Sequence, residues 1–323
     1  MNIILITPAG RGSRAGNRAT ATRWARFLRR LGHRVDVSVE YDGRPAELMI
    51  ALHAWRSADA IRRFSIAHPD RPLLVVLTGT DIYRFQRSHP DTTLESMERA
   101  HALIGLHDRV GDDIPARFHP KLHPVLQSAL PLTRRLPPPR SAFEVCVVGH
   151  LREEKDSLRA ARAVGDLPAG SRLRVVNVGK AHNAEWEAAA REEMAVNPRF
   201  RWRGEVPHAE VRRLMARARL MVMSSVMEGG ANVVSEACVA GLPVIASDIP
   251  GNRGLLGDDY PGYYPTADTA ALRAALLRAE REPDFLDALR RHCLARAPLF
   301  RPEAERDGLR RVIEHVVAPS VTA

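Results

Sequence analysis

The chain has 323 residues, too many for one hydrophobic core of ordinary size, so two domains are expected. A hydrophobic fraction of 45% indicates a folded protein, and no apolar run approaches the roughly 20 residues that a membrane span requires. The formal charge of +10 raises the question of a nucleic-acid or membrane partner, but arginines alternate with acids along stretches such as 272–291, so solvated helix faces explain most of it.

The first residues predict the cellular compartment of the protein, and the spacing of the cysteines predicts their chemical state. Residues 2–7 predict a strand and lack the charged head, apolar middle and cleavage site of a signal peptide, so we expect a cytoplasmic protein. The cysteines are Cys146, Cys238 and Cys293. Their spacing matches neither a metal site nor a redox motif, so buried free thiols are expected.

A glycine-rich loop follows the first predicted strand. Strand 2–7, this loop, a helix and a second strand at 33–39 form the opening unit of a doubly wound sheet. Gly10, Gly12 and Gly16 miss the G-x-G-x-x-G spacing of dinucleotide-binding folds. A dehydrogenase is therefore not expected.

Arginines crowd the loop and the start of the helix, where acidic residues would suit the helix dipole better. Arg14 and Arg18 flank the backbone amides of Gly16 and Asn17. Guanidinium groups beside such amides predict a site for a small anionic acceptor such as a phosphate. The alternative is an ordinary basic surface of an arginine-rich chain, which explains Arg11 or Arg23 alone.

Two short apolar strands follow, and polar residues come directly after each. Residues 48–52 end at His53, and residues 73–77 lead into Thr80 and Asp81. Both ends should open onto one crevice, because ligands of parallel sheets bind beyond the carboxyl ends of the strands. The alternative for His53 and Asp81 is capping of a loop. Later strands of this lobe are predicted at 103–106 and 124–126.

A proline-rich stretch marks the expected domain boundary. The segment 134–140, RRLPPPR, cannot continue a helix or a central strand and predicts a stiff connector. The predicted parts are an acceptor-binding domain at 1–135, a linker at 136–140, a donor-binding domain at 141–300, and a C-terminal helix at 301–323 that crosses back to the first domain.

The second lobe opens with a predicted strand at 143–148, the turn GHLREEKD and a helix from Ser157. A further apolar strand at 220–223 leads to Glu228, Gly229 and Gly230. Asn232 is expected to cap a helix at 233–239, whose first amides attract phosphate. A carboxylate beside a phosphate site suits a ligand that also carries hydroxyl groups, as a sugar nucleotide does.

The pattern E-x7-E at Glu228 and Glu236, followed by E-A-x-x-x-G-x-P-V-I-A-S-D, resembles the donor site of retaining, GT-B-fold glycosyltransferases of the family 4 type. The resemblance implies an α/β fold of two Rossmann-like doubly wound parallel-sheet domains facing a cleft. It also implies that Glu228 contacts the donor sugar and Glu236 the ribose of the nucleotide.

Other segments carry the same resemblance. In GHLREEK, Lys155 matches a lysine that clamps the nucleotide diphosphate, but His150 stands where the family has arginine. Either Arg152 substitutes, His150 acts in its charged form, or the diphosphate binds more weakly. FRWRGEV resembles the segment whose backbone contacts the base, which implies that role for Val206. Thr78 replaces the family's histidine before the G-x-D motif, so no general base is implied there.

Within that family, residues 7–35 together with VVLTGTDIYR resemble the selenosugar synthases of selenoneine biosynthesis. This resemblance implies transfer of a sugar from a UDP-sugar, such as UDP-N-acetylglucosamine or UDP-glucose, to the selenium of selenophosphate. The predicted catalytic residues are Glu228, His53 and Lys155. The predicted donor-binding residues are His150, Arg152, Lys155, Val206, Glu228, Gly229, Gly230, Ala231, Asn232 and Glu236. The predicted acceptor-binding residues are Arg14, Gly16, Asn17, Arg18, Thr80 and Asp81.

No cofactor or metal is expected, because amides and cations can stabilise the departing diphosphate and the sequence has no D-x-D cluster. Three other functions stay open: a family 4 enzyme with a hydroxyl acceptor, a UDP-sugar epimerase, and a basic nucleic-acid-binding protein. The expected partners are the UDP-sugar and selenophosphate, without nucleic acid and without membrane insertion.

Overall fold

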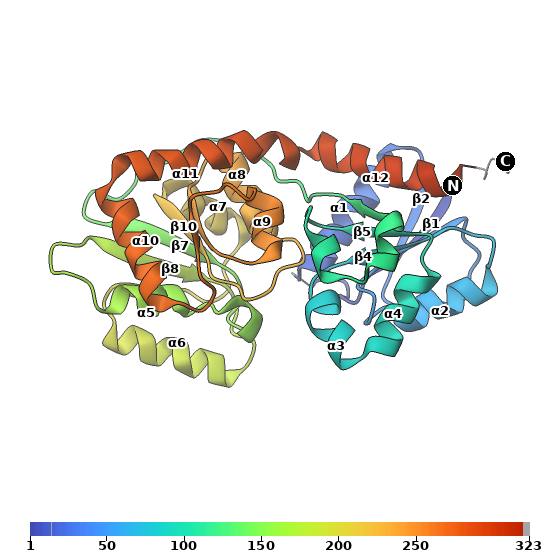
Figure 1. Ribbon diagram of the computed structural model, residues 1–323, viewed down its shortest axis with the longest axis horizontal. Helices are drawn as coiled ribbons and strands as arrows, with labels where there is room; N and C mark the ends of the chain where they lie inside the picture. The colour runs from blue at the N-terminus through green and yellow to red at the C-terminus, as the bar shows by residue number, and fades with distance from the viewer. Residues whose placement is uncertain (14, 319–323) are drawn as a thin grey trace. The chain divides into compact units, whose positions relative to one another are not determined.

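The computed structural model describes residues 1–13 and 15–318 (Figure 1). The chain divides into two compact units: Met1–Gln127 together with the chain from Pro302, and Ser128–Arg301. The first change of unit thus falls after Gln127 rather than at the predicted linker 136–140, which lies inside the second unit. The predicted helix at the C-terminus is α12, Pro302–Val317, and it belongs to the first unit.

The first unit is built on a parallel sheet of strand order β2-β1-β3-β4-β5-β6. Its strands are β1 Asn2–Ile6, β2 Arg34–Ser38, β3 Leu48–Leu52, β4 Leu73–Leu77, β5 Ala102–Gly105 and β6 Leu122–Pro124. Its helices are α1 Gly16–Arg30, α2 Ala58–Ala67, a π-helical turn Asp81–Phe85, α3 Gln86–Ser88, α4 Pro90–Arg99, 3-10 turns at Val110–Asp113 and Ala116–Lys121, and α12.

Both faces of this sheet are buried, which explains why its central strands read as unbroken apolar runs. Successive residues of β1 enter different cores: Ile3 packs with Trp24 of α1 and Leu309 of α12, whereas Ile4 packs with Phe64 of α2. Figure 1 shows helices flanking the sheet accordingly. The sheet is therefore the middle layer of an α/β sandwich.

The second unit contains a parallel sheet of order β12-β11-β10-β7-β8-β9. Its strands are β7 Phe143–Val148, β8 Leu173–Val178, β9 Phe200–Trp202, β10 Leu220–Met223, β11 Val244–Ser247 and β12 Tyr263–Tyr264. Its helices are a 3-10 turn Glu153–Lys155, α5 Arg159–Gly165, α6 Ala184–Val196, α7 His208–Arg217, α8 Asn232–Ala240, α9 Pro250–Leu256, α10 Thr269–Arg281, α11 Pro283–Arg296 and a 3-10 turn Ala297–Phe300.

The strand orders confirm the prediction of two doubly wound parallel sheets. The order reverses between β1 and β3 in the first unit and between β7 and β10 in the second. In open α/β sheets these reversal points are where ligands bind, because the loops diverge there and leave a crevice. Ligands are thus expected at the loops after β1 and β3, and at those after β7 and β10.

Some local predictions were wrong. The last strand of the first unit is Leu122–Pro124 instead of 124–126. The segment 200–206, which resembles the base-contacting segment of the family, forms strand β9 over Phe200–Trp202, and the chain turns at Gly204, which has a φ of +66°. Of the described helices, none combines the length and apolar character that a membrane span needs. All three cysteines are buried free thiols, as expected.

Candidate active site

The reversal point of the second sheet brings two predicted site residues together. β7 pairs with β10 in parallel, so the loops after Val148 and Met223 leave the same edge of the sheet. Lys155 lies in the first loop and Glu228 in the second, and their side chains form an ion pair between Nζ and Oε1. The side chain of Glu228 is only 7% exposed.

The surroundings of Glu228 hold its carboxylate in one orientation. Ser225 Oγ donates to the same oxygen, Oε1, at 2.5 Å. Among the described residues, no partner is recorded for Oε2. One oxygen is thus fixed by the protein, and the other can accept a hydrogen bond from a ligand hydroxyl.

Backbone contacts join the two loops. Val226 N donates to Glu154 O at 3.0 Å, and Ser224 Oγ donates to Asp156 O at 2.9 Å. On the other side, the start of α9 lies against Glu228: a Cβ built on Gly251 would stand 2.2 Å from Glu228 O. The segment 224–228 is therefore held by the loop after β7 at Ser224 and Val226 and by the start of α9 at Glu228.

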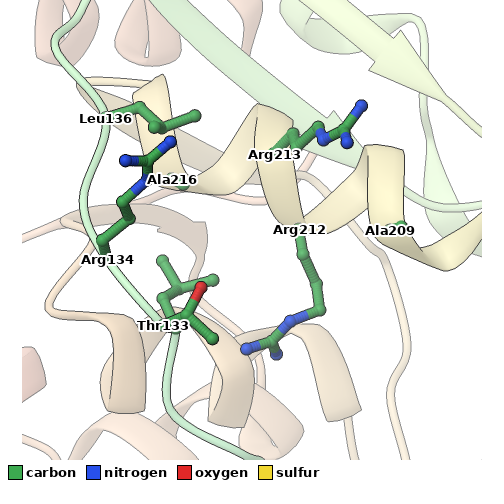
Figure 2. Close-up of a pocket in the computed structure, with 8 residues that line it drawn as sticks. Thr133, Arg134, Leu136, Ala209, Arg212, Arg213 and Ala216 are labelled. Carbon is green, nitrogen blue, oxygen red and sulfur yellow. The ribbon is translucent and has the colours of Figure 1, made fainter.

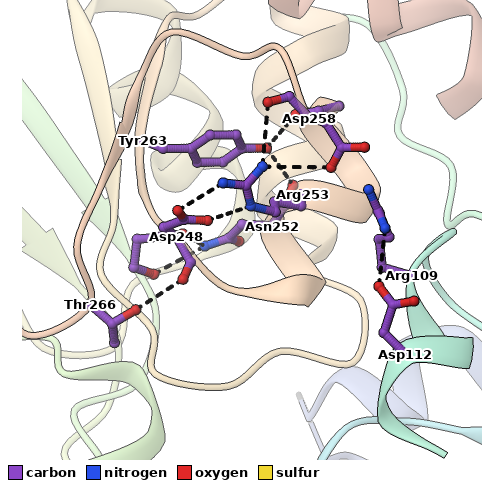
Figure 3. A network of polar contacts seen from close by, with 10 residues as sticks. Arg109, Asp112, Asp248, Asn252, Arg253, Asp258, Tyr263 and Thr266 are labelled. Carbon is purple, nitrogen blue, oxygen red and sulfur yellow. Dashed lines mark hydrogen bonds and ion pairs between the residues drawn. The ribbon is translucent and has the colours of Figure 1, made fainter.

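A polar network anchors α9 in this position (Figure 3). Arg253 donates to both carboxylate oxygens of Asp248, at 2.6 and 2.9 Å, and its guanidinium also lies 3.6 Å from Asp258. Asn252 Nδ2 donates to Ser247 O at 2.9 Å, so α9 is tied to the end of β11. Because Gly251 belongs to the same short helix, this network also limits the movement of Glu228.

The helix after Glu228 begins one residue earlier than predicted. Ala231 is the N-cap and Asn232 is already helical, so the predicted capping role of Asn232 was wrong. Ala231 has no side chain that could bond the amides of the first turn, whereas a capping asparagine would occupy one of them. The turn that contains Gly229 and Gly230 therefore leads directly to a helix start suited to an anionic ligand.

His150 lies at the other end of the loop after β7. Its Nδ1 accepts a hydrogen bond from Lys180 N at 3.0 Å, which leaves Nε2 to carry the proton of the neutral ring. Burial lowers the pKa of His150, and the nearby charge of Arg152 lowers it further. Arg152 lies 3.3 Å from Glu154. These contacts favour His150 as a neutral N–H donor over the alternative of a charged imidazolium.

Gly179 allows this loop to approach its neighbour. A Cβ on Gly179 would lie 2.0 Å from Gly149 O, and its φ of +151° disfavours other residues. Trp202 Nε1 donates to Gly179 O at 2.8 Å. The half-buried indole of Trp202 thus stabilises the loop that contains Gly179.

Glu236 has a neighbour that the sequence analysis missed. His208, the first residue of α7, places Nε2 3.9 Å from Glu236 Oε1. The nearby carboxylate of Glu236 raises the pKa of His208, although burial opposes the shift. Val206, the predicted contact of the base, lies just before α7 and only two residues from His208. A histidine two residues after Val206 was the available signal.

In the first unit, His53 directly follows β3 and has a left-handed conformation, with a φ of +76°. Its Nδ1 accepts from Arg56 N at 3.1 Å, and its Nε2 lies 3.0 Å from Thr80 Oγ1. Burial lowers the pKa of His53, against the effect of the nearby Asp81 carboxylate. The ring is thus neutral and donates from Nε2 to Thr80.

Asp81 acts on the backbone. It is fully buried and accepts from the amides of Ala54, Thr78 and Gly79 at 2.7–3.0 Å. These bonds tie the loop after β3 to the loop after β4. Asp81 therefore positions His53 and Thr80, as the loop-capping alternative proposed.

The predicted anion site at the start of α1 is described only in part, because Arg14 lies outside the described residues. Gly16 begins α1, and Ala15 precedes it without a capping side chain. Asn17 and Arg18 are half-buried in the first turn. Arg23 does not join them: it donates to Glu305 of α12 at 2.7 Å, and Trp24 donates to the same carboxylate.

Comparisons with known proteins agree with this geometry. The model of the family described as "Glycosyl transferases group 1" matches residues 133–296. No curated protein matches the chain.

In the part of the chain that the structure describes, no group of three or more His, Cys, Asp and Glu side chains is placed to hold a metal ion.

Solved structures share the fold over nearly the whole chain. Sucrose-phosphate synthase from Thermosynechococcus elongatus has a TM-score of 0.80 at 16% identity, covering 99% of this chain and 100% of that one. Anabaena HepE in complex with UDP and glucose has a TM-score of 0.78 at 14% identity, covering 98% and 100%. The lipopolysaccharide galactosyltransferase WaaB has a TM-score of 0.70 at 15% identity, covering 98% and 99%. The fold is thus that of GT-B glycosyltransferases, as predicted.

Proposed function

Since the chain belongs to the group 1 glycosyl transferases, we propose that it moves a sugar from a UDP-sugar to the selenium of selenophosphate. UDP-N-acetylglucosamine and UDP-glucose are the proposed donors. The observation that carries the donor half is the buried Glu228 carboxylate, paired with Lys155 at the reversal point of the second sheet. HepE, which has a similar fold, was solved in complex with UDP and glucose, which supports a UDP-sugar here.

The donor is proposed to lie along the loops after β7 and β10. The diphosphate would accept hydrogen bonds from the amides of Gly230, Ala231 and Asn232 and form an ion pair with Lys155. His150 would donate a further hydrogen bond to it from Nε2. A diphosphate beside Lys155 would share its ammonium with Glu228, and Oε2 of Glu228 would accept from a sugar hydroxyl. Arg152 adds positive charge at the rim of the site.

The nucleoside is proposed to lie farther along the edge of the sheet. Glu236 would accept from the ribose hydroxyls, as the family resemblance implies, and the backbone of Val206 would contact the base. His208 lies 3.9 Å from Glu236, so it would border the ribose. The glycines at 229 and 230 allow the backbone to approach the ligand closely.

In the proposed reaction, selenium attacks the anomeric carbon as the bond from that carbon to the UDP oxygen breaks. UDP leaves with the electron pair, and Lys155 and the helix amides stabilise the charge that develops on it. Water then attacks phosphorus, the selenium–phosphorus bond breaks, and the selenosugar and phosphate are released. Selenophosphate is already an anionic nucleophile, so a strong protein base is not required.

The acceptor half rests on the first unit and on the resemblance of residues 7–35 to selenosugar synthases. Gly16, Asn17 and Arg18 supply amides and a cation suited to a phosphate, with Arg14 as the proposed second cation. His53 and Thr80 would line the acceptor side, positioned by Asp81. This arrangement suits an acceptor that is small and highly charged.

The direct test is incubation of the full chain with each UDP-sugar, with and without selenophosphate, followed by mass spectrometry. A selenium-containing sugar and UDP are expected only when both substrates are present. A changed sugar without any acceptor would indicate an epimerase instead. A glycosylated hydroxyl compound, with no selenosugar, would indicate a conventional enzyme of the family. Salt-sensitive retention of DNA or RNA without any transfer would indicate a nucleic-acid-binding protein.

Arg18 provides a test of the acceptor half alone. Arg18→Ala is expected to raise the KM for selenophosphate about tenfold or more, because a charge-assisted hydrogen bond is lost, and to leave the KM for the UDP-sugar unchanged. Arg26→Ala is the matched control, since Arg26 is an exposed arginine of the same helix. An unchanged selenophosphate KM in Arg18→Ala would count against this acceptor site.

A further inference from the structure

The second unit has a basic hollow away from the loops described above. It has a volume of about 340 Å³ and lies where the chain segment 132–136 passes α7 (Figure 2). Thr133 and Arg134 line it from the segment, and Arg212 and Arg213 line it from the helix. None of these residues belongs to the proposed donor or acceptor site.

Hydrogen bonds hold the two walls of the hollow together. Arg212 Nη1 donates to Leu130 O at 3.1 Å, and Leu136 N donates to Ala216 O at 3.0 Å. Arg135 reaches past the helix end and donates to Met215 O and Ala218 O, both at 3.0 Å. These bonds hold the chain segment against α7, while the exposed side chains of Thr133, Arg134 and Arg213 lie outside them.

The lining of the hollow carries positive charge without a compensating acid. No Asp or Glu is among the described residues that line it. Elsewhere on α7 and next to it, arginines have acidic partners: Arg203 lies 2.6 Å from Glu210, and Arg217 lies 2.7 Å from Glu144. Arg134 and Arg213 have no recorded carboxylate partner among the described residues, and Arg212 bonds only neutral carbonyls.

We propose that this hollow binds a phosphate group. Arg134 and Arg213 are exposed and point in different directions in Figure 2, so they would turn toward the ligand to supply the charge and N–H donors. Thr133 would add a hydroxyl donor, and Leu132 and Leu136 would contact an apolar part of the ligand. Guanidinium groups match phosphate oxygens in geometry, and a hollow of this size admits a small phosphorylated molecule. The phosphate can come from a soluble metabolite or from a lipid headgroup.

Calorimetric titration of the full chain with inorganic pyrophosphate, in the presence of saturating UDP, tests the proposal. UDP fills the proposed donor site, so pyrophosphate that still binds one-to-one binds elsewhere. Arg134→Gln/Arg213→Gln is expected to raise the Kd for pyrophosphate at least tenfold. Arg191→Gln/Arg310→Gln removes the same charge from exposed helical ion pairs and should change it less than twofold.

A second arm identifies the source of the phosphate. Sedimentation of the protein with vesicles of phosphatidylcholine and phosphatidic acid, lost in the Arg134→Gln/Arg213→Gln variant, would indicate a lipid headgroup. Pyrophosphate binding without such sedimentation would indicate a soluble molecule. The proposal is overturned if neither probe binds, or if the control variant weakens binding as much as the Arg134/Arg213 variant. Circular dichroism of both variants checks that they are folded, and no step requires transferase activity.

Discussion

At the scale of single residues, the properties of the site depend on how individual side chains are paired. Lys155 and Ser225 both bond Oε1 of Glu228, which leaves Oε2 to face a ligand. A carboxylate buried to 7% exposure would be costly without such partners, so the pair also explains why a charged group is tolerated at this depth. The same ion pair serves folding and the proposed chemistry.

Glu228→Gln tests that role. Glutamine keeps the shape but removes the charge, so kcat/KM is expected to fall about a hundredfold or more, the size of effect seen when one preorganised contact to a transition state is lost. Steady-state kinetics with UDP-N-acetylglucosamine measure it. Glu153→Gln, in the exposed part of the loop after β7, is the control. Activity within twofold of wild type in Glu228→Gln would contradict the assignment.

His208 gives a pH dependence. Its pKa lies above the ordinary value of 6.5 in the folded protein, chiefly because of Glu236, so the stabilisation that it provides is complete below about pH 6.5 and is lost as the pH rises through the folded pKa. The Tm of His208→Gln is thus expected to lie below that of wild type at pH 5.5 and to equal it at pH 9.

The effect should be small, because the His208 side chain is 70% exposed and solvent screens the pair. Thermal melts at the two pH values measure it, with His182→Gln as the control, since His182 is also exposed in the second unit. A Tm difference that grows with pH would show that the sign is wrong.

At the scale of elements, α1 and α12 are joined by a buried charge. Glu305 of α12 is fully buried and accepts from Arg23 and from the indole N–H of Trp24. Trp24 and Leu309 also meet in the hydrophobic core on this face of the sheet. The C-terminal helix is therefore an integral layer of the first unit, although nearly the whole chain separates it from α1.

Glu305→Ala is expected to lower the free energy of unfolding of the first unit by about 3–5 kcal/mol, because a partly buried guanidinium and a buried indole N–H lose their acceptor. Urea unfolding followed by tryptophan fluorescence measures the change. Glu303→Ala, on the exposed part of the same helix, should stay within about 0.5 kcal/mol of wild type. Equal unfolding midpoints for Glu305→Ala and wild type would rule out this role.

At the scale of the whole molecule, each doubly wound sheet brings predicted site residues together beyond the carboxyl ends of neighbouring strands, and in the second sheet these strands mark the reversal point. β7 and β10 bring Lys155 to Glu228, and the loops after β3 and β4 bring His53 to Thr80. The net charge of +10 is consistent with anionic substrates, and several helical arginines are paired with nearby acids, such as Arg191 with Glu187.

Removal of divalent metals is expected to leave the transferase active. The charge on the departing UDP is assigned to Lys155 and the amides at the start of α8, so kcat after dialysis against EDTA should remain within twofold of the untreated enzyme. Assays of UDP release, repeated with added Mg²⁺ or Mn²⁺, measure this. Complete loss of activity that Mg²⁺ restores would contradict the proposed mechanism.

The sequence by itself determined the fold class and the main strands. The runs 48–52, 73–77, 143–148 and 220–223 are strands with those bounds in the structure. These are central strands of parallel sheets, buried on both faces, so they read as apolar runs between turn-formers, with Glu144 as the one charged residue among them. His53 directly follows β3, and Lys155 and Glu228 lie in the segments that follow β7 and β10.

Only the tertiary structure decided the pairings. Lys155 meets Glu228 across 73 residues, and Arg23 meets Glu305 across 282. Asp81 turned out to bond backbone amides, and His208 was found beside Glu236. Periodicity and spacing describe each segment from its own residues, whereas these contacts depend on which strands lie side by side and how their loops are directed. That information exists only once the sheets have formed.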